Sequence, residues 1–181
     1  MIFLLRILAA FAPAALKKRE MQHLFRISAS AFGCAVPCIA ALSYGQSLSE
    51  FARFTRSEAV KLYSPGGDIE GARERLFHGG RTLGERIRGI CRIATGDQAV
   101  SAMRILYRAI GIDARFKGSV MTVSRCYFSS GYSPETCNLL SALDDGIFTG
   151  LSGGERLRFI RRLTDGSACC RADIITGGEC R

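Results

Sequence analysis

A thiol and a carboxylate on one predicted helix are the groups of this sequence best placed to do chemistry. Four positions of segment 133–148 recur at spacings of three, four and three residues and so share a helix face: Cys137, Leu140, Asp144 and Ile147. Burying a charged carboxylate on an apolar face is costly unless the group is paired. We therefore expect Asp144 to have a cationic partner or to line a cavity next to Cys137.

A partner for that carboxylate is predicted on the strand that follows the helix. In the segment ERLRFIRRL (155–163), strand alternation places Arg161 on the same face as Leu157 and Phe159. The sequence therefore predicts an ion pair between Asp144 and Arg161.

The chain is rich in cysteine, with eight residues, and three of them could join the same site. Cys126 and Cys137 can be joined by only one of the adjacent pair Cys169 and Cys170, because consecutive strand residues point to opposite faces. Three thiols beside a carboxylate could bind a transition metal, with Cys126, Cys137 and Cys170 as ligands, or hold a nucleophile. Their spacing matches no standard zinc or iron–sulfur pattern, and free cysteine is commonly a small buried apolar residue. The sequence leaves both alternatives open.

A glycine-rich stretch, GLSGGERLRF (150–159), is similar to the signature loop of ABC-type ATPases. That loop completes a nucleotide site only together with a G-x-x-x-x-G-K-[ST] loop, which this sequence lacks. Nucleotide hydrolysis is therefore not expected. We interpret 150–154 as the end of a helix and the start of a strand, where glycine supplies positive φ angles.

The elements that must position these side chains follow from hydrophobic periodicity and turn signals. Residues 1–63 are expected to be helical, with a capping box at Ser47 and Glu50, and 68–94 to form two short helices around Gly79 and Gly80. The remaining pattern predicts a helix, a hairpin, a helix and a second hairpin: 95–111, 112–129, 133–151 and 155–175. The fold class is therefore α+β, with an antiparallel sheet of about four strands. We expect a helical N-terminal extension (1–63) and an α+β domain (64–181) within one continuous globular unit.

Composition is that of an ordinary globular protein, with 48% hydrophobic and 23% charged residues. The formal net charge is +9, but no basic run is longer than LKKRE (16–20), and neither aromatic-basic nor zinc-finger motifs occur. Nucleic acid is therefore not an expected partner. A chain of this length does not need disulfides to fold, so reduced thiols in the cytoplasm are expected.

The N-terminal apolar stretch (2–16) is interrupted by Arg6 and Pro13 and is too short to span a bilayer. Two interpretations stay open for it. It packs as a helix on the core or on a protein partner, or it forms a peripheral membrane anchor through residues 2–19, whose basic side chains contact anionic headgroups.

The combination CYFSSGYSPETCNLLSALDDGIFTGL…LRFIRRLTDGSACCRADI (126–174) is similar to the C-terminal half of the L-2-amino-thiazoline-4-carboxylic acid hydrolase-like family. The shared features are a strand cysteine, a Pro-Glu-x-Cys run at a helix start, an acidic residue in mid-helix, an arginine-containing strand and a closing Gly-x-x-x-Cys element. They correspond here to Cys126, Pro134 to Cys137, Asp144, Arg158 or Arg161, and Gly166 with Cys170. Related four-vinyl-reductase-like domains, which bind small hydrophobic or redox ligands, share the helix and hairpin order.

The resemblance implies a hydrolase that opens a small sulfur heterocycle or a related C–N bond. Asp144 would then be the general base or the anchor of a substrate amine, and Cys137 a second catalytic residue. Arg161 would clamp a substrate carboxylate, with Cys126 and Glu135 also at the substrate site. The alternative is a non-enzymatic sensor or accessory module whose cavity holds a hydrophobic molecule, a haem or a thiolate-bound metal.

Overall fold

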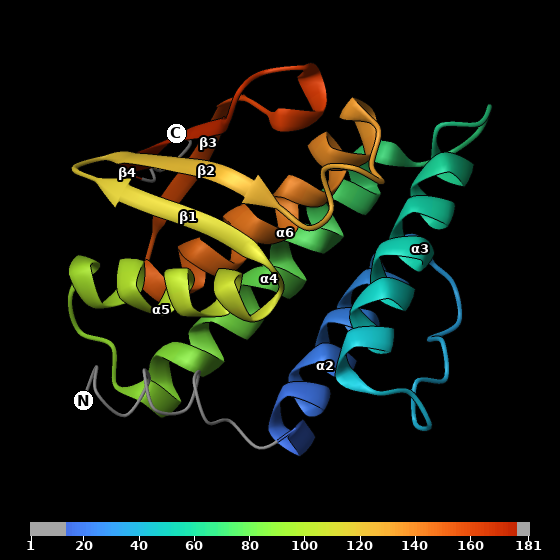
Figure 1. Ribbon diagram of the computed structural model, residues 1–181, viewed down its shortest axis with the longest axis horizontal. Coiled ribbons are helices and arrows are strands. Elements are labelled where there is room, and N and C mark those ends of the chain that lie inside the picture. The colour runs from blue at the N-terminus through green and yellow to red at the C-terminus, as the bar shows by residue number, and fades with distance from the viewer. Residues whose placement is uncertain (1–13, 177–181) are drawn as a thin grey trace.

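The computed structural model describes residues 14–176, which form a group of helices beside a small sheet (Figure 1). Within this range there are five α-helices, and four strands form one antiparallel sheet in the C-terminal half. The predicted α+β fold is therefore confirmed. The predicted N-terminal segment 2–16 falls mostly outside the described residues. None of the described helices combines the length and the apolar character needed to cross a membrane.

Three helices precede the sheet: α2 (Ala14–Phe32), α3 (Tyr44–Leu62) and α4 (Ile69–Cys91). Helix α3 begins one turn earlier than predicted, because its capping box is formed by Ser43 and Gln46. The Ser43 hydroxyl accepts a hydrogen bond from the backbone N–H of Gln46 at 3.3 Å, and the Gln46 side chain accepts one from the N–H of Ser43 at 2.8 Å. Ser47, the predicted cap, is buried inside the helix and donates to the Ser43 carbonyl.

Helix α4 is one continuous helix of 23 residues, and the prediction of two short helices around Gly79 and Gly80 is wrong. The reason lies in its packing against α6 (Pro134–Ser152). A Cβ atom added to Gly84 would lie 2.2 Å from the carbonyl oxygen of Ile147, and one added to Gly146 would lie 2.1 Å from that of Phe77. A Cβ atom on Gly80 would likewise lie 2.5 Å from the Leu143 carbonyl oxygen, and one on Gly79 would lie 2.6 Å from the Ile27 side chain of α2. These glycines therefore serve close helix contacts and do not mark a break.

The sheet is built from two hairpins separated by α6. Helix α5 (Gly96–Ala109) leads into β1 (Ile112–Lys117) and β2 (Val120–Cys126), and α6 is followed by β3 (Glu155–Arg161), the 3₁₀ turn η1 (Leu163–Asp165) and β4 (Cys170–Thr176). The strand order is β1-β2-β4-β3, so the two hairpins meet where β2 pairs with β4.

The ends of α6 follow the sequence signals. Its N-cap is Ser133, whose hydroxyl accepts from the N–H of Thr136 at 3.2 Å, and Pro134 occupies the first turn. It ends at Gly153, with φ of 86°, and Gly154 follows with φ of 139°. The interpretation of the LSGG stretch as a helix end that leads into a strand is confirmed, because these positive φ angles favour glycine.

Helices α5 and α6 cover one face of the sheet (Figure 1). The covered face carries the buried strand residues Ala114, Met121 and Ala172, and Phe116 of β1 stacks on Phe148 of α6 with ring centroids 6.3 Å apart. One contiguous cluster of buried side chains joins this layer to α2 and α3, where Phe25 contacts Phe51 and Phe54. The helices and the sheet therefore share one hydrophobic core.

Candidate ligand-binding cavity

A cavity of about 400 Å³ reaches from the surface into this core and is lined by side chains from all five described helices. Most of the lining is aliphatic or aromatic, including Leu83, Met103, Leu106, Phe128 and Ile147. Ligand pockets in proteins usually occupy ~300–1,000 Å³ and are mainly apolar, with a few polar groups. The cavity has the size and lining of such a pocket.

The cavity is elongated along α6. Cys137 and Ile147 both line it and are ten residues apart on that helix. At a rise of ~1.5 Å per residue this separation is about 15 Å along the helix axis. The lining then continues to Ile90 at the end of α4. The shape suits a molecule that is longer than it is wide.

Asp144 supplies a carboxyl group to the cavity wall, as its position on the helix face predicted. The side chain is surrounded by protein, yet it remains partly accessible from the cavity. Burial raises the pKa of this carboxyl from 3.8 to about 7, while a hydrogen bond with the Tyr107 side chain lowers it and the neighbouring Asp145 raises it further. Near neutral pH the protonated and the ionised forms of this carboxyl are therefore both populated.

Two tyrosines lie beside this carboxyl and were not predicted as part of a site. Tyr107 of α5 is almost fully buried, and burial together with the charge of Asp144 raises the pKa of its hydroxyl. Tyr132, in the loop before α6, shares a hydrogen bond with the Thr55 hydroxyl at 2.5 Å, and burial raises its pKa as well. Both hydroxyls are therefore protonated. The Tyr107 hydroxyl donates to Asp144, and the Tyr132 hydroxyl donates to Thr55, whose own proton goes to the Phe51 carbonyl, so both tyrosine oxygens can accept a hydrogen bond.

Three thiols lie near the same carboxyl. Cys126 and Cys137 line the cavity. The buried Cys170 lies near Asp144, and burial together with the negative charge of Asp144 raises the pKa of the Cys170 thiol. Burial raises the pKa of Cys126 to about 12 and raises the pKa of Cys137 and of Cys170. These cysteines are therefore neutral thiols, which are poor nucleophiles.

The thiols do not form the metal site that the sequence allowed. In the part of the chain that the structure describes, no group of three or more His, Cys, Asp or Glu side chains is arranged to hold a metal ion. Cys126, Cys137 and Cys170 come from three different elements, β2, α6 and β4, and are not grouped closely enough to hold an ion. The prediction of these three cysteines as metal ligands is therefore not carried further.

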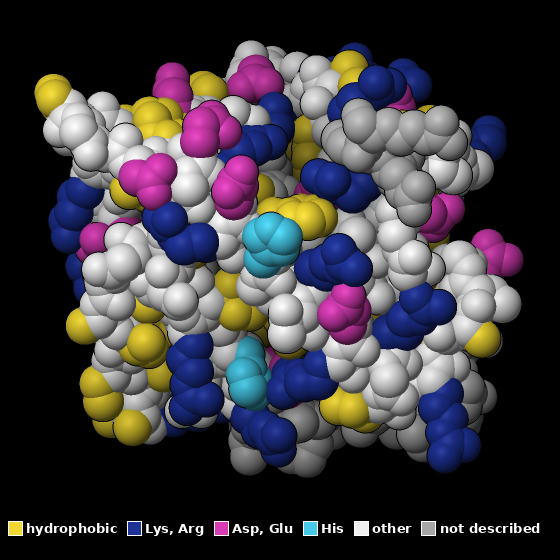
Figure 2. Space-filling model, turned by 180° about the vertical axis from the view of Figure 1, so that it is seen from behind, with side chains coloured by type: hydrophobic (Ala, Val, Ile, Leu, Met, Phe, Trp, Pro, Cys, Tyr) yellow, Lys and Arg dark blue, Asp and Glu magenta, His cyan; other side chains and the backbone are white. Residues whose placement is uncertain are grey.

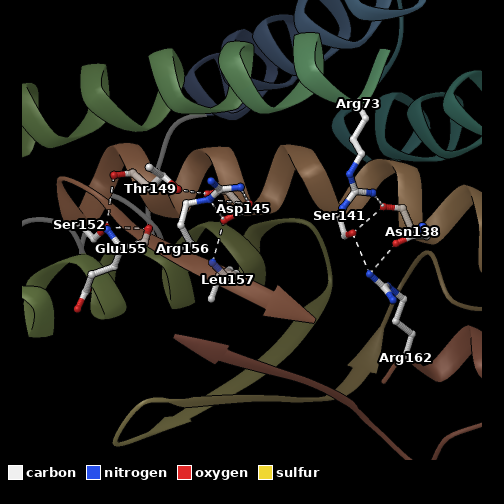
Figure 3. A network of polar contacts seen from close by, with 10 residues as sticks. All are labelled: Arg73, Asn138, Ser141, Asp145, Thr149, Ser152, Glu155, Arg156, Leu157 and Arg162. Atoms are coloured by element: carbon white, nitrogen blue, oxygen red, sulfur yellow. Dashed lines mark hydrogen bonds and ion pairs between the residues drawn. The ribbon is translucent and has the colours of Figure 1, made fainter. Parts of the chain in front are cut away.

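The predicted ion pair between Asp144 and Arg161 is wrong. The pairing of β3 with β4 is irregular between Phe159 and Arg161, which turns both Ile160 and Arg161 toward solvent. Arg162 takes the inward position. Its guanidinium donates to the Asn138 side chain at 3.0 Å and to the Ser141 hydroxyl at 3.1 Å, and its positive charge lowers the pKa of Asp144 (Figure 3).

The carboxylate that does form an ion pair is the neighbouring residue, Asp145. Its oxygens accept from the Arg156 guanidinium at 2.6 and 2.9 Å and from the backbone N–H of Leu157 at 2.8 Å (Figure 3). Arg156 also stacks over the Phe77 ring at 4.2 Å. These contacts join α6, β3 and α4 and are structural, because none of these four residues lines the cavity.

Glu135, which the resemblance placed at the substrate site, lies outside it. Its side chain is exposed in the first turn of α6 and is absent from the cavity lining. Its backbone carbonyl accepts a hydrogen bond from the Tyr63 hydroxyl at 2.9 Å. The residue favours the positive end of the α6 dipole and has no contact with the Asp144 region.

Charged side chains lie at the opposite end of the cavity from Cys137. Arg19, Glu20 and Arg86 contribute to its lining, and the Arg86 guanidinium contacts both Glu20, at 2.5 Å, and the ring nitrogen of His23, at 2.9 Å. On the face shown in Figure 2, basic, acidic and histidine side chains are interspersed. The cavity therefore joins an ionic end near α2 to an apolar interior with Asp144 in its wall.

Comparison with known proteins adds no family assignment. No protein-family model matches this sequence, and no curated protein matches it at a significant level. The cavity and its polar groups are therefore the basis for any functional proposal.

Proposed function

We propose that this protein binds a small, elongated and mainly apolar molecule in the cavity and holds one polar group of that molecule against Asp144. The supporting observation is the cavity itself, at about 400 Å³, with one deeply placed carboxyl in a mainly apolar wall. An apolar lining provides affinity through burial, and a few fixed polar groups provide orientation.

The polar end of the cavity determines what the ligand must carry. When ionised, Asp144 accepts hydrogen bonds or pairs with a cation, and when protonated it can also donate. The hydroxyl oxygens of Tyr107 and Tyr132 add acceptors next to it, since their protons are donated to Asp144 and Thr55. An amine, an amidine or a hydroxyl group at one end of an apolar molecule fits this set.

The test of binding uses a fluorescent apolar probe, Nile red, with displacement by alkyl amines and alkyl alcohols of equal chain length. The variant Leu106→Trp fills the cavity from α5 and is expected to abolish probe binding. Val60→Trp places the same side chain at an exposed position of α3 and is the matched control. Equal probe binding by the two variants would show that the probe does not occupy the cavity.

Hydrolysis is a second candidate, and the pKa of Asp144 favours it. A general base works best when its pKa lies near the operating pH, and burial raises the pKa of this carboxyl to about 7. Asp144 would accept a proton from a water molecule that attacks a small heterocycle of the thiazoline carboxylate type. The neutral thiols would shape the pocket, since their raised pKa values disfavour nucleophilic attack.

Turnover of 2-aminothiazoline-4-carboxylate, followed by mass spectrometry, tests this candidate. Asp144→Asn keeps the size of the side chain and removes the base, so it is expected to abolish turnover while apolar probes still bind. Absence of turnover by the unmodified protein across about pH 6 to 9, a range that brackets the raised pKa, would exclude this substrate and leave the binding proposal standing.

A further inference from the structure

The sheet has a second face, opposite to the one that α5 and α6 cover. Register identifies its residues, because residues paired across antiparallel strands point to the same side. The row of Phe116, Met121, Ala172 and Phe159 points to the helices, so the rows on either side of it point away. The side chains of those two rows form the surface that we call the open face.

The open face is strongly basic. Its first row, in the order of the strands, is Arg115, Thr122, Arg171 and Arg161. Its second row is Lys117, Val120, Asp173 and Arg158. All five cations are exposed. With strands ~4.8 Å apart, each row spans about 14 Å.

The single acid of these two rows does not neutralise them. Asp173 contacts Arg158 at 3.4 Å and Arg171 at 3.8 Å, which leaves five positive charges against one negative charge. Elsewhere basic and acidic side chains are interspersed, as on the face in Figure 2. Charges of one sign held on a rigid sheet attract a partner of opposite charge.

The neighbouring side chains indicate what kind of polyanion this partner is. The two rows contain no aromatic residue, so the open face lacks the stacking platform that single-stranded nucleic acid requires. Instead, exposed isoleucines accompany the cations, with Ile160 next to Arg161 on β3 and Ile175 two residues beyond Asp173 on β4. Cations with adjacent exposed aliphatic side chains suit a lipid interface, where the cations contact phosphates and the aliphatic groups enter the acyl boundary.

We propose that the open face of the sheet binds the anionic headgroups of a lipid bilayer, with Arg115, Lys117, Arg158, Arg161 and Arg171 contacting lipid phosphates. This surface is separate from the cavity and does not depend on the function proposed for it. It does not include residues 2–19, for which the sequence suggested membrane contact.

Co-sedimentation of the full chain with vesicles tests the proposal. Mixed phosphatidylcholine and phosphatidylglycerol vesicles are expected to bind the protein, and binding is expected to weaken as salt rises. Pure phosphatidylcholine vesicles are expected to bind it poorly. The triple variant Arg115→Gln, Arg161→Gln, Arg171→Gln removes the first row and is expected to weaken binding roughly 100-fold, from about 5-fold per basic residue.

A matched triple variant removes the same amount of charge elsewhere. Arg26→Gln, Arg56→Gln and Arg108→Gln alter exposed arginines on α2, α3 and α5 and are expected to change binding only a few-fold. Any contribution from residues before α2 is common to both variants. Circular dichroism and thermal melting establish that each variant folds.

The aliphatic contribution has its own variant, Ile160→Ser with Ile175→Ser. We expect roughly 10-fold weaker vesicle binding from this pair because less apolar surface enters the lipid. Its salt dependence is expected to stay unchanged, since no charge is altered.

Three results would overturn the proposal. The first is equal binding of the full chain to anionic and neutral vesicles, and the second is equal loss in the two triple variants. The third is binding of duplex DNA, lost only in the first-row variant, without binding to vesicles, which would assign the open face to nucleic acid.

Discussion

The stability of the variant Asp144→Asn, relative to that of the unmodified protein, should rise with pH. The buried carboxyl has its pKa raised from 3.8 to about 7, so the folded state holds a proton that the unfolded chain releases. Its contribution to stability is fully present below about pH 4 and is lost as the pH rises through about 7. The complete loss amounts to ~4 kcal/mol at 1.36 kcal/mol for each unit of pKa.

Between about pH 5 and about pH 8 the same relation gives a change of roughly 2.5 kcal/mol. We therefore expect the unfolding free energy of Asp144→Asn, minus that of the unmodified protein, to rise by this amount across the range. Asparagine keeps the shape of the side chain and does not titrate, so the difference isolates this one group.

Chemical denaturation at several pH values measures this difference. Asp97→Asn, which removes an exposed carboxylate from the first turn of α5, controls for the loss of one negative charge. A direct reading comes from the carboxyl carbon of Asp144 in an NMR titration, with a midpoint expected near pH 7. A midpoint near 4, or a stability difference that does not change with pH, would refute the deduction that this carboxyl is buried and lacks a strong cationic partner.

Other changes test the packing, the ion pair and the thiols. Gly84→Ala should destabilise the protein by more than ~2 kcal/mol, because its Cβ would meet the Ile147 carbonyl. Gly89→Ala, which has open space around it, should stabilise α4 by up to about 1 kcal/mol. Thermal melting measures both variants, and similar shifts in melting temperature would contradict the close contact between α4 and α6. Asp145→Asn should lower the unfolding free energy by about 2 kcal/mol, which is less than for a fully buried ion pair because Arg156 is partly exposed. Denaturant unfolding measures this loss, and an unchanged midpoint would show that the ion pair is weak. Iodoacetamide near pH 8 should modify Cys126 at least ~100-fold more slowly than the exposed Cys38 in peptide mapping, and equal rates would contradict the raised pKa.

Local signals in the sequence were sufficient to predict the ends of several elements. Ser133 and Thr95, the first residues of the predicted segments 133–151 and 95–111, cap α6 and α5, and Gly153 ends α6, because each supplies a backbone partner or conformation within a few residues. Helical spacing alone also put Asp144 and Cys137 on one face, and both line the cavity. These features depend on short-range geometry, which the sequence contains.

Features that depend on contacts between distant segments were missed. The irregular pairing before Arg161 arises where β3 meets β4, and no local pattern predicts which residue turns outward. Helix α4 runs through Gly79 and Gly80 because α2 and α6 pack closely against it there, although the same glycines suggest a break when read alone. The Tyr107 hydroxyl meets Asp144 only after α5 and α6 pack together, which the predicted helix 95–111 did not reveal.

The glycine contact between α4 and α6 determines which wall of the cavity can change. The two backbones already touch at Gly84 and Gly146, so this wall can neither move inward nor accept larger side chains at those positions. Substitutions that enlarge or reshape the cavity are therefore more readily accepted on other walls, such as those of α2 and α5, where Leu24 and Met103 line it. Divergence toward new ligands, natural or engineered, should concentrate on these two helices while the glycine-bearing pair stays constant.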